Sequence, residues 1–87
     1  MSKIVFDEVA WEDYLWCQMS DQKTLKKLNA LIKDIARHPF EGIGKPEALK
    51  GEDGMWSRRV NEKDRLVYEA HDGAVFIRQC CGHYGDK

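Results

Sequence analysis

The 87-residue sequence lacks the marks of membrane and secreted proteins. No apolar run approaches the roughly 18 residues that cross a bilayer, and the first residues lack the apolar stretch of a signal peptide. Three cysteines are an odd number, without the spacing of a disulfide framework. We therefore expect a cytoplasmic protein with reduced thiols and no membrane association.

Common catalytic and metal-binding motifs are also missing. The sequence has no glycine-rich phosphate loop, no Gly-x-Ser-x-Gly elbow and no dinucleotide fingerprint. Cys80, Cys81 and His83 lie close together, but adjacent strand residues point to opposite faces, and no second ligand pair is spaced for zinc. We expect neither a metal ion nor any other cofactor.

Charge of one sign is not in excess, because the net charge is only −1. The charges are nevertheless unevenly placed: residues 7–21 contain acids but no Lys or Arg, whereas residues 23–37 contain five cations and one acid. The basic segment is suited to contact phosphates. With 43% hydrophobic and 33% charged residues, we expect one soluble globular domain over residues 1–87.

Residue spacing predicts a strand, two helices and then a series of strands. A β-prone run at 3–6 precedes Asp7, which can cap a helix through Gln18. Asp21 can cap a second helix, which must end near Arg37 because Pro39 follows. The apolar stripe of this second helix consists of Leu25, Leu28, Leu31, Ile32, Ile35 and Ala36. After a loop at 39–47, we expect strands at 48–50, 55–60, 65–70 and 74–81.

This order of elements indicates an α+β fold, with two N-terminal helices packed on one face of a small, twisted, mainly antiparallel sheet. We expect most of the large aromatic residues to lie in the core, and these are Trp11, Tyr14, Trp16 and Trp56. The other face of the sheet is left open. We expect it to carry the long cations of the strands, namely Lys50, Arg58, Arg59, Arg65 and Arg78.

Two interpretations of these cations are open from the pattern alone. A three-residue loop centred on Glu62 would place Arg59 opposite Arg65, where two guanidinium groups repel each other unless an anion binds. Alternatively, each arginine pairs with a nearby acid on a solvated surface. His83 and Tyr84 are likewise either an exposed tail or side chains brought to the rim of the sheet.

The ordered motifs resemble those of the YoeB (Txe/YoeB) toxins within the RelE/ParE superfamily. The resemblance covers nearly the whole chain and implies a RelE-like, microbial RNase-like fold. The family's final His-Tyr pair is followed here by three further residues, Gly85 to Lys87, which departs from the family's pattern. The main matching stretches are Trp11-x-x-Tyr14, Gly42-x-Gly44-Lys45-Pro46-Glu47-x-Leu49-Lys50, Trp56-Ser57-Arg58-Arg59, Arg65-Leu66-Val67-Tyr68 and His83-Tyr84.

The resemblance implies a type II toxin that cuts messenger RNA in the ribosomal A site and so inhibits translation. It implies Glu47 as general base, Arg65 as the phosphate-stabilising arginine and His83 as general acid. Supporting positions match Lys50, Arg59 and Tyr84. Such a metal-free endoribonuclease removes the 2′-hydroxyl proton and protonates the leaving 5′-oxygen, giving a 2′,3′-cyclic phosphate.

The same resemblance implies several partners. These are a YefM-like antitoxin that silences the toxin, the ribosome with its mRNA, operator DNA through the antitoxin complex, and a second copy in a homodimer. Two other functions are open: a DNA-binding repressor component with little cleavage activity, and a ParE-like toxin that acts on gyrase. The gyrase function would not require Glu47, Arg65 and His83 together, so their presence counts against it.

Overall fold

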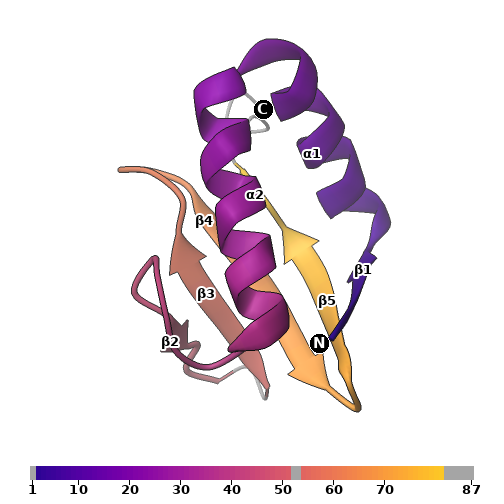
Figure 1. Cartoon of the computed structure of the whole chain (residues 1–87), viewed down its shortest axis with the longest axis vertical. Coiled ribbons are helices and arrows are strands. Elements are labelled where there is room, and N and C mark those ends of the chain that lie inside the picture. The colour runs from indigo at the N-terminus through magenta and orange to yellow at the C-terminus, as the bar shows by residue number, and fades with distance from the viewer. Residues whose placement is uncertain (1, 52–53, 82–87) are drawn as a thin grey trace.

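The computed structural model describes residues 2–51 and 54–81, which form one sheet covered by two helices (Figure 1). The elements in chain order are β1 (Lys3–Phe6), α1 (Glu8–Ser20), α2 (Gln22–Arg37), β2 (Glu47–Ala48), β3 (Met55–Arg59), β4 (Arg65–His71) and β5 (Ala74–Gln79). The predicted α+β class is therefore confirmed. Neither of the helices in this described part is long and apolar enough to cross a membrane.

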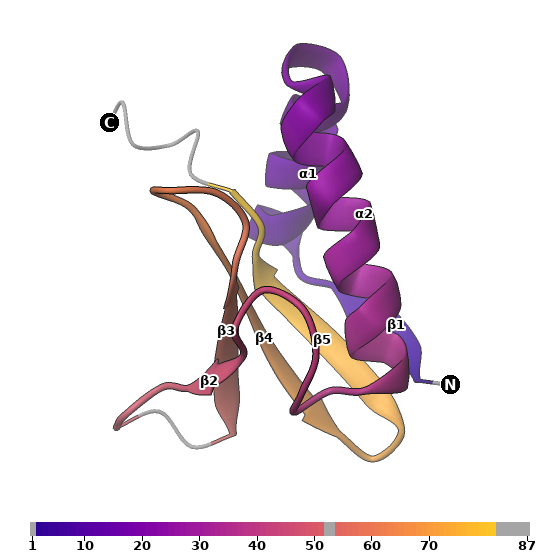
Figure 2. The same cartoon turned by 60° about the vertical axis from the view of Figure 1, so that its left-hand side comes forward.

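The sheet has the strand order β1-β5-β4-β3-β2. Strands β2 to β5 pair antiparallel with their neighbours, whereas β1 pairs parallel to β5. Both helices lie on one side of the sheet, as Figure 2 shows. The expected arrangement of two helices on one face of a mainly antiparallel sheet is thus confirmed, and the opposite face carries no helix within the described residues.

Side-chain caps set where both helices begin. The Asp7 carboxylate accepts a hydrogen bond from the Ala10 amide at 3.1 Å, and Asp21 accepts one from the Thr24 amide at the same distance. The Thr24 hydroxyl also donates to Asp21, and these hydrogen bonds lower the pKa of the Asp21 carboxyl. α2 ends at Arg37, as predicted from the proline that follows.

The core lies between α2 and the central strands. Leu28, Leu31 and Ile35 are fully buried on α2 and form one cluster with the buried side chains of β4 and β5. Burying each such side chain contributes about 1.5–3 kcal/mol, so this layer is the main source of stability.

The aromatic residues of α1 depart from expectation. Trp11 is 45% exposed and Trp16 is 41% exposed, so placing them in the core was wrong. α1 instead buries the short side chains Ala10, Asp13 and Cys17. Small residues on this face let the helix backbone approach the sheet closely, which leaves no room beneath the helix for an indole ring.

Several strand boundaries also differ from expectation. β3 ends one residue before the predicted strand at 55–60, and β4 ends one residue after the predicted strand at 65–70. β2 begins at Glu47 and ends at Ala48, because only these two residues pair with β3. The strand predicted at 48–50 was therefore wrong by one residue at its start and by two at its end. β5 ends at Gln79, so the strand predicted over 74–81 is two residues shorter.

Cys80 and Cys81 were expected on opposite faces of a strand, and that expectation is wrong. The Cys80 thiol donates to the carbonyl of Ala10 at 3.5 Å, and the Cys81 thiol donates to the carbonyl of Asp13 at 3.6 Å. Both side chains are buried against α1. Strand alternation no longer applies once pairing stops at Gln79, so both thiols can turn towards the same helix.

Arg58 does not lie on the open face, where the sequence analysis placed it. Its side chain is fully buried on the helix side, where its guanidinium contacts the Asp34 carboxylate and the Tyr68 hydroxyl. It also donates to the carbonyl oxygens of His38, Glu41 and Ile43. Adjacent strand residues face opposite ways, so Arg58 and Arg59 cannot share a face.

This buried arginine sets the path of the long loop after α2. Its nitrogens hold the carbonyls of residues 38–43, and the Tyr68 hydroxyl donates to the carbonyl of Pro39 at 2.6 Å. The Arg59 amide then donates to the carbonyl of Gly44 at 2.7 Å. The loop therefore delivers Glu47 to the sheet edge at a defined place.

Candidate active site

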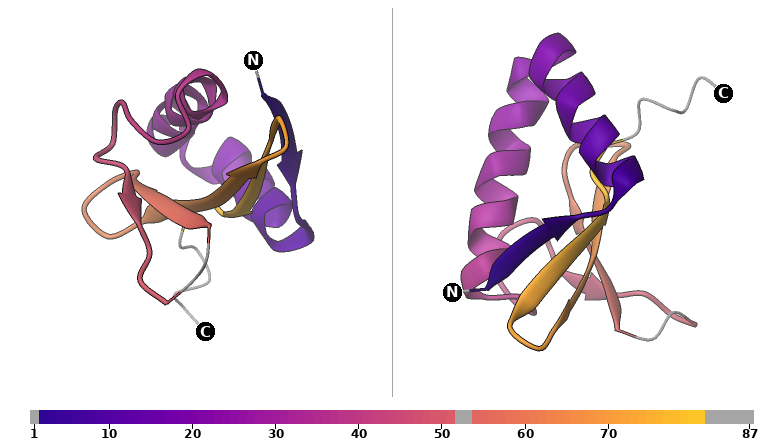
Figure 3. Two further views of the ribbon diagram at one scale, coloured as in Figure 1. Left: turned by 90° about the horizontal axis from the view of Figure 1, so that it is seen from below. Right: turned by 90° about the vertical axis from the view of Figure 1, so that its right-hand side faces the viewer.

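Three of the six candidate residues meet on the open face of the sheet. Glu47 pairs with Ser57 across β2 and β3, and Arg59 pairs with Arg65 across β3 and β4. Directly opposite residues share a face, and so do residues two apart on one strand, so Glu47, Arg59 and Arg65 all face away from the helices. In Figure 3, this end of the sheet, with β2 at its edge, lies far from β1. The register predicted for Arg59 and Arg65 is confirmed.

Glu47 and Arg65 form a loose ion pair. Glu47 Oε1 lies 3.5 Å from Arg65 Nη2, and the Glu47 side chain is 67% exposed. An ion pair in contact with water contributes at most about 1 kcal/mol, so a phosphate can replace it at little cost. The carboxylate is thus accessible and close to a cation that does not hold it tightly.

Arg65 is anchored by one edge of its guanidinium. Nε donates to the Ser57 hydroxyl at 2.9 Å, and Ser57 is itself buried. Nη2 is a buried nitrogen with no hydrogen-bond partner among the described residues. A buried donor without a partner is unfavourable, so Arg65 Nη2 favours binding of an anion that supplies an acceptor.

Ser57 was not singled out from the sequence. Its position two residues before Arg59 was the available signal, because this spacing puts it on the same face as the candidate residues. The serine positions the arginine.

Arg59 and Lys50 extend the positive charge around this pair. Both are exposed, and neither forms an ion pair with any residue in 2–51 or 54–81. Arg59 lies opposite Arg65, and Lys50 follows β2 in a turn. Two unpaired cations and a loosely paired arginine at one end of the sheet match the anion-binding interpretation.

Arg78 supports the alternative interpretation, in which an arginine pairs with nearby acids. Its Nη2 lies 2.8 Å from Glu69 Oε2, and Nη1 lies 3.5 Å from Asp7 Oδ2. Hydrogen bonds from Arg78 lower the pKa of the Glu69 carboxyl, while Glu69 in turn raises the pKa of Arg78. This arginine is neutralised by its neighbours, so the positive site consists of Lys50, Arg59 and Arg65 rather than all five cations.

His83 and Tyr84 lie outside the described residues. The last described part of the chain has one contact near the site, since the Gln79 side chain donates to the carbonyl of Arg65 at 3.5 Å. The Cys80 amide that follows donates to Asp13 on α1 at 3.4 Å. Within residues 2–51 and 54–81, no group of three or more His, Cys, Asp or Glu side chains is arranged to hold a metal ion.

The chain is similar to proteins of one known family. The family described as YoeB-like toxin of bacterial type II toxin-antitoxin system matches residues 6–84. A toxin YoeB of Synechocystis sp. is 55% identical over 83 residues, which cover 94% of this chain and 96% of that protein.

Two solved structures from Staphylococcus aureus are also closely similar. A YoeB dimer superimposes with a TM-score of 0.87 at 46% identity, covering 95% of this chain and 98% of the other. A heterotetrameric YoeB-YefM toxin-antitoxin complex contains a chain that superimposes with a TM-score of 0.86 at 45% identity, covering 97% and 99%.

Proposed function

Because the chain belongs to the YoeB-like toxins of bacterial type II toxin-antitoxin systems, we propose that it is a ribosome-dependent endoribonuclease that cleaves mRNA in the ribosomal A site. The observation that carries this proposal is the contact between the Glu47 carboxylate and an Arg65 guanidinium whose Nη2 donates no hydrogen bond to a described residue. This arrangement puts a proton acceptor beside a phosphate site on an accessible sheet face.

In the proposed reaction, Glu47 takes the proton from the ribose 2′-hydroxyl, and the 2′-oxygen attacks the adjacent phosphorus. Negative charge grows on the phosphate oxygens, where Arg65, Arg59 and Lys50 stabilise it. The bond from phosphorus to the 5′-oxygen breaks, and His83 protonates that oxygen with support from Tyr84. The products are a 2′,3′-cyclic phosphate and a 5′-hydroxyl.

Chain length supports the role proposed for His83. Four residues span at most about 14 Å when fully extended, and Gln79, four positions earlier, already touches the backbone of Arg65. The chain length thus permits an imidazole at position 83 to approach a phosphate bound at Arg65.

By analogy with the Staphylococcus aureus complex, we also propose that a YefM-like antitoxin neutralises the toxin. We propose that it does so by covering the cationic open face. An acidic antitoxin segment suits Lys50, Arg59 and Arg65, which lack strong acidic partners among the described residues. By analogy with the Staphylococcus aureus dimer, we propose that the toxin forms a homodimer. Operator DNA binding by the antitoxin complex stays a prediction from the family resemblance.

The test is primer extension on a translated transcript with wild type, Glu47→Gln and the control Glu12→Gln. Glu12 is an exposed acid on α1, away from the site. We expect discrete cuts with wild type and Glu12→Gln, and loss of about 100-fold or more in rate with Glu47→Gln. Equal cutting by Glu47→Gln would reject Glu47 as the base. A wild type that represses its operon with its antitoxin but cuts nothing would indicate a repressor component instead.

A further inference from the structure

The outward side of α2 carries five cations outside any ion pair of the described residues. All five are exposed, and none forms an ion pair with a residue in the described part of the chain. They are Lys23, Lys26, Lys27, Lys33 and Arg37. Most proteins intersperse charges of both signs on a helix surface, so an unpaired set on one helix calls for an explanation.

These cations form a continuous strip. At about 100° per residue, they fall within a sector of roughly 120°, opposite the buried stripe of Leu28, Leu31 and Ile35. From Lys23 to Arg37 the strip is roughly 21 Å long, at 1.5 Å per residue. Between the cations lie only Ala30 and Asp34.

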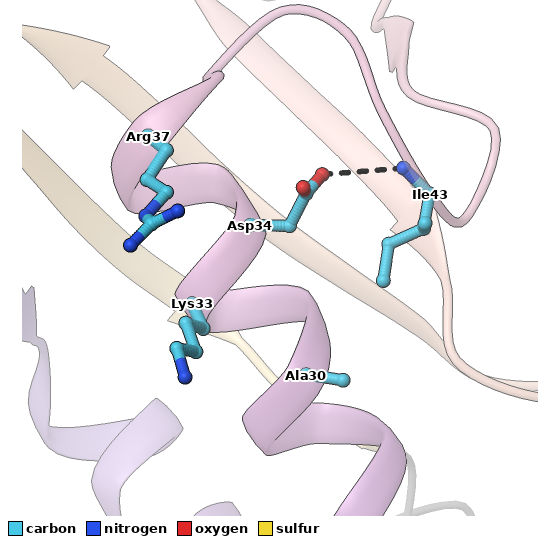
Figure 4. Close-up of a pocket in the computed structure, with 5 residues that line it drawn as sticks. All are labelled: Ala30, Lys33, Asp34, Arg37 and Ile43. Atoms are coloured by element: carbon cyan, nitrogen blue, oxygen red, sulfur yellow. Dashed lines mark hydrogen bonds between the residues drawn. The ribbon is translucent and has the colours of Figure 1, made fainter.

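The one acid in the strip is already occupied. Asp34 points towards the loop, where it contacts Arg58 Nη1 and accepts a hydrogen bond from the Ile43 amide at 3.2 Å. Figure 4 shows Lys33 and Arg37 pointing away from this contact. Because Asp34 is turned inward, it offsets little of the positive charge outside.

Shallow depressions flank the strip at both ends. One of about 250 Å³ is lined by Ala30, Lys33, Asp34, Arg37 and Ile43 (Figure 4). Another of about 350 Å³ is lined by Asp21, Lys23, Thr24, Lys27, Val60 and Asn61. Each therefore has two cations and one aspartate in its wall, and both aspartates accept hydrogen bonds from other residues of the chain.

This strip is separate from the proposed active site. α2 packs on the sheet face opposite to Glu47 and Arg65, so a phosphate held at the open face cannot also contact the strip. Any anion that the strip binds is therefore distinct from the phosphate bound at the proposed active site.

We propose that this α2 strip binds the sugar-phosphate backbone of ribosomal RNA, holding the toxin on the ribosome while the open face meets the mRNA. This inference rests on the proposed ribosome-dependent cleavage. Lysine-rich strips suit sequence-independent contact with phosphates along an RNA backbone. An acidic peptide that folds on binding would need several apolar anchors. Among the described residues, Ile43 is the one large exposed apolar side chain in the wall of either depression. The others lie on other elements, and these are Val9, Trp11, Trp16, Met19 and Phe40.

The test measures binding of the toxin to purified 70S ribosomes by sedimentation at several salt concentrations. All proteins carry Glu47→Gln, so cleavage does not complicate the binding measurement. Lys33→Gln/Arg37→Gln is compared with Lys3→Gln/Lys63→Gln, which removes two exposed cations outside α2. Glutamine keeps a good helix propensity, so folding is preserved, which thermal unfolding checks.

We expect the α2 variant to bind ribosomes about tenfold more weakly and to reduce the slope of log K against log salt by about 1.4–1.8, since each phosphate contact contributes about 0.7–0.9. The control pair should match the parent. Equal affinity and slope for both pairs would overturn the proposal. So would loss of antitoxin binding in the α2 variant with ribosome binding intact, because the strip would then serve the antitoxin.

Failure of this inference and failure of the proposed function have different signatures. If the strip is not used, wild type still cuts translated mRNA, but the α2 variant binds ribosomes normally. If the toxin is not a nuclease, wild type cuts nothing, although its binding to ribosomes still depends on α2.

Discussion

Arg58 Nη1 and Asp34 Oδ2 lie 2.5 Å apart, joining the middle of β3 to the last turns of α2. The arginine side chain is fully buried, whereas the aspartate is partly exposed. The same guanidinium binds three loop carbonyls, so all of its hydrogen-bonding edges are used and burial of its charge is compensated. The pair connects the helix layer, the sheet and the loop that leads to Glu47.

Asp34→Asn should destabilise the protein by about 2 kcal/mol, because the buried Arg58 charge loses its anionic partner while a hydrogen-bond acceptor is retained. Urea unfolding measures the change. Asp72→Asn is the control, since Asp72 lies in an exposed turn with a positive φ that asparagine tolerates. Equal stability of the two variants would mean that the buried pair contributes nothing net.

Acid stability should depend on Asp34. Its hydrogen bond with Arg58 lowers the pKa of the Asp34 carboxyl below the ordinary value of 3.8. This stabilisation is therefore present above about pH 4 and is lost as the pH falls through the folded-state pKa. Between pH 5 and pH 2, wild type should lose more stability than Asp34→Asn in parallel urea titrations. Parallel curves would contradict the assignment.

Gly42→Ala should cost more than Gly73→Ala, although both glycines have a positive φ. A Cβ at position 42 would collide with Asp34 Oδ2 and crowd Arg58, whereas a Cβ at position 73 meets nothing within 4 Å. The alanine at 73 should cost about 1 kcal/mol for backbone conformation alone, and the alanine at 42 should cost clearly more. Chemical denaturation of the two variants measures both values; a cost at 42 no larger than at 73 would be inconsistent with this contact.

Arg59→Gln should change activity and stability in opposite directions. Removing one of two directly opposed guanidinium groups should stabilise the fold by about 0.2–0.5 kcal/mol at low salt, with less gain at high salt. Cleavage of translated mRNA should fall at least about tenfold, because a phosphate-stabilising charge is lost. Arg78→Gln is the contrasting control: it breaks ion pairs with Glu69 and Asp7, so stability should fall slightly while cleavage persists. A loss of stability in Arg59→Gln would refute the repulsion.

The three thiols should be unreactive in the folded protein. Burial raises the pKa of Cys17, Cys80 and Cys81 above the ordinary value of 9.0, so little thiolate is present near neutral pH. Iodoacetamide at pH 8 should modify them at least about tenfold more slowly in buffer than in urea, as followed by mass spectrometry. Stability should also fall as the pH rises above about 9, because the unfolded chain then loses these protons first. Rapid labelling in buffer would contradict burial.

Local signals in the sequence were enough for the helices and for part of the site. Asp7 and Asp21 cap helices through hydrogen bonds three residues away, and the period of the Leu28 to Ile35 stripe reflects helix geometry alone. The pairing of Arg59 with Arg65 was also predictable, because a three-residue loop centred on Glu62 places them directly opposite each other. Such features depend on residues close together in the chain.

Only the tertiary structure decided the roles of Arg58, Ser57 and the C-terminal cysteines. Arg58 binds Asp34, which lies 24 residues earlier, and Cys80 contacts Ala10, which lies 70 residues earlier. The pattern of charges and apolar residues did not show that an arginine would be buried or that two adjacent thiols would face one helix. Those outcomes depend on which distant backbone groups come close when the helices pack on the sheet, because a buried polar side chain goes where its hydrogen bonds can be satisfied.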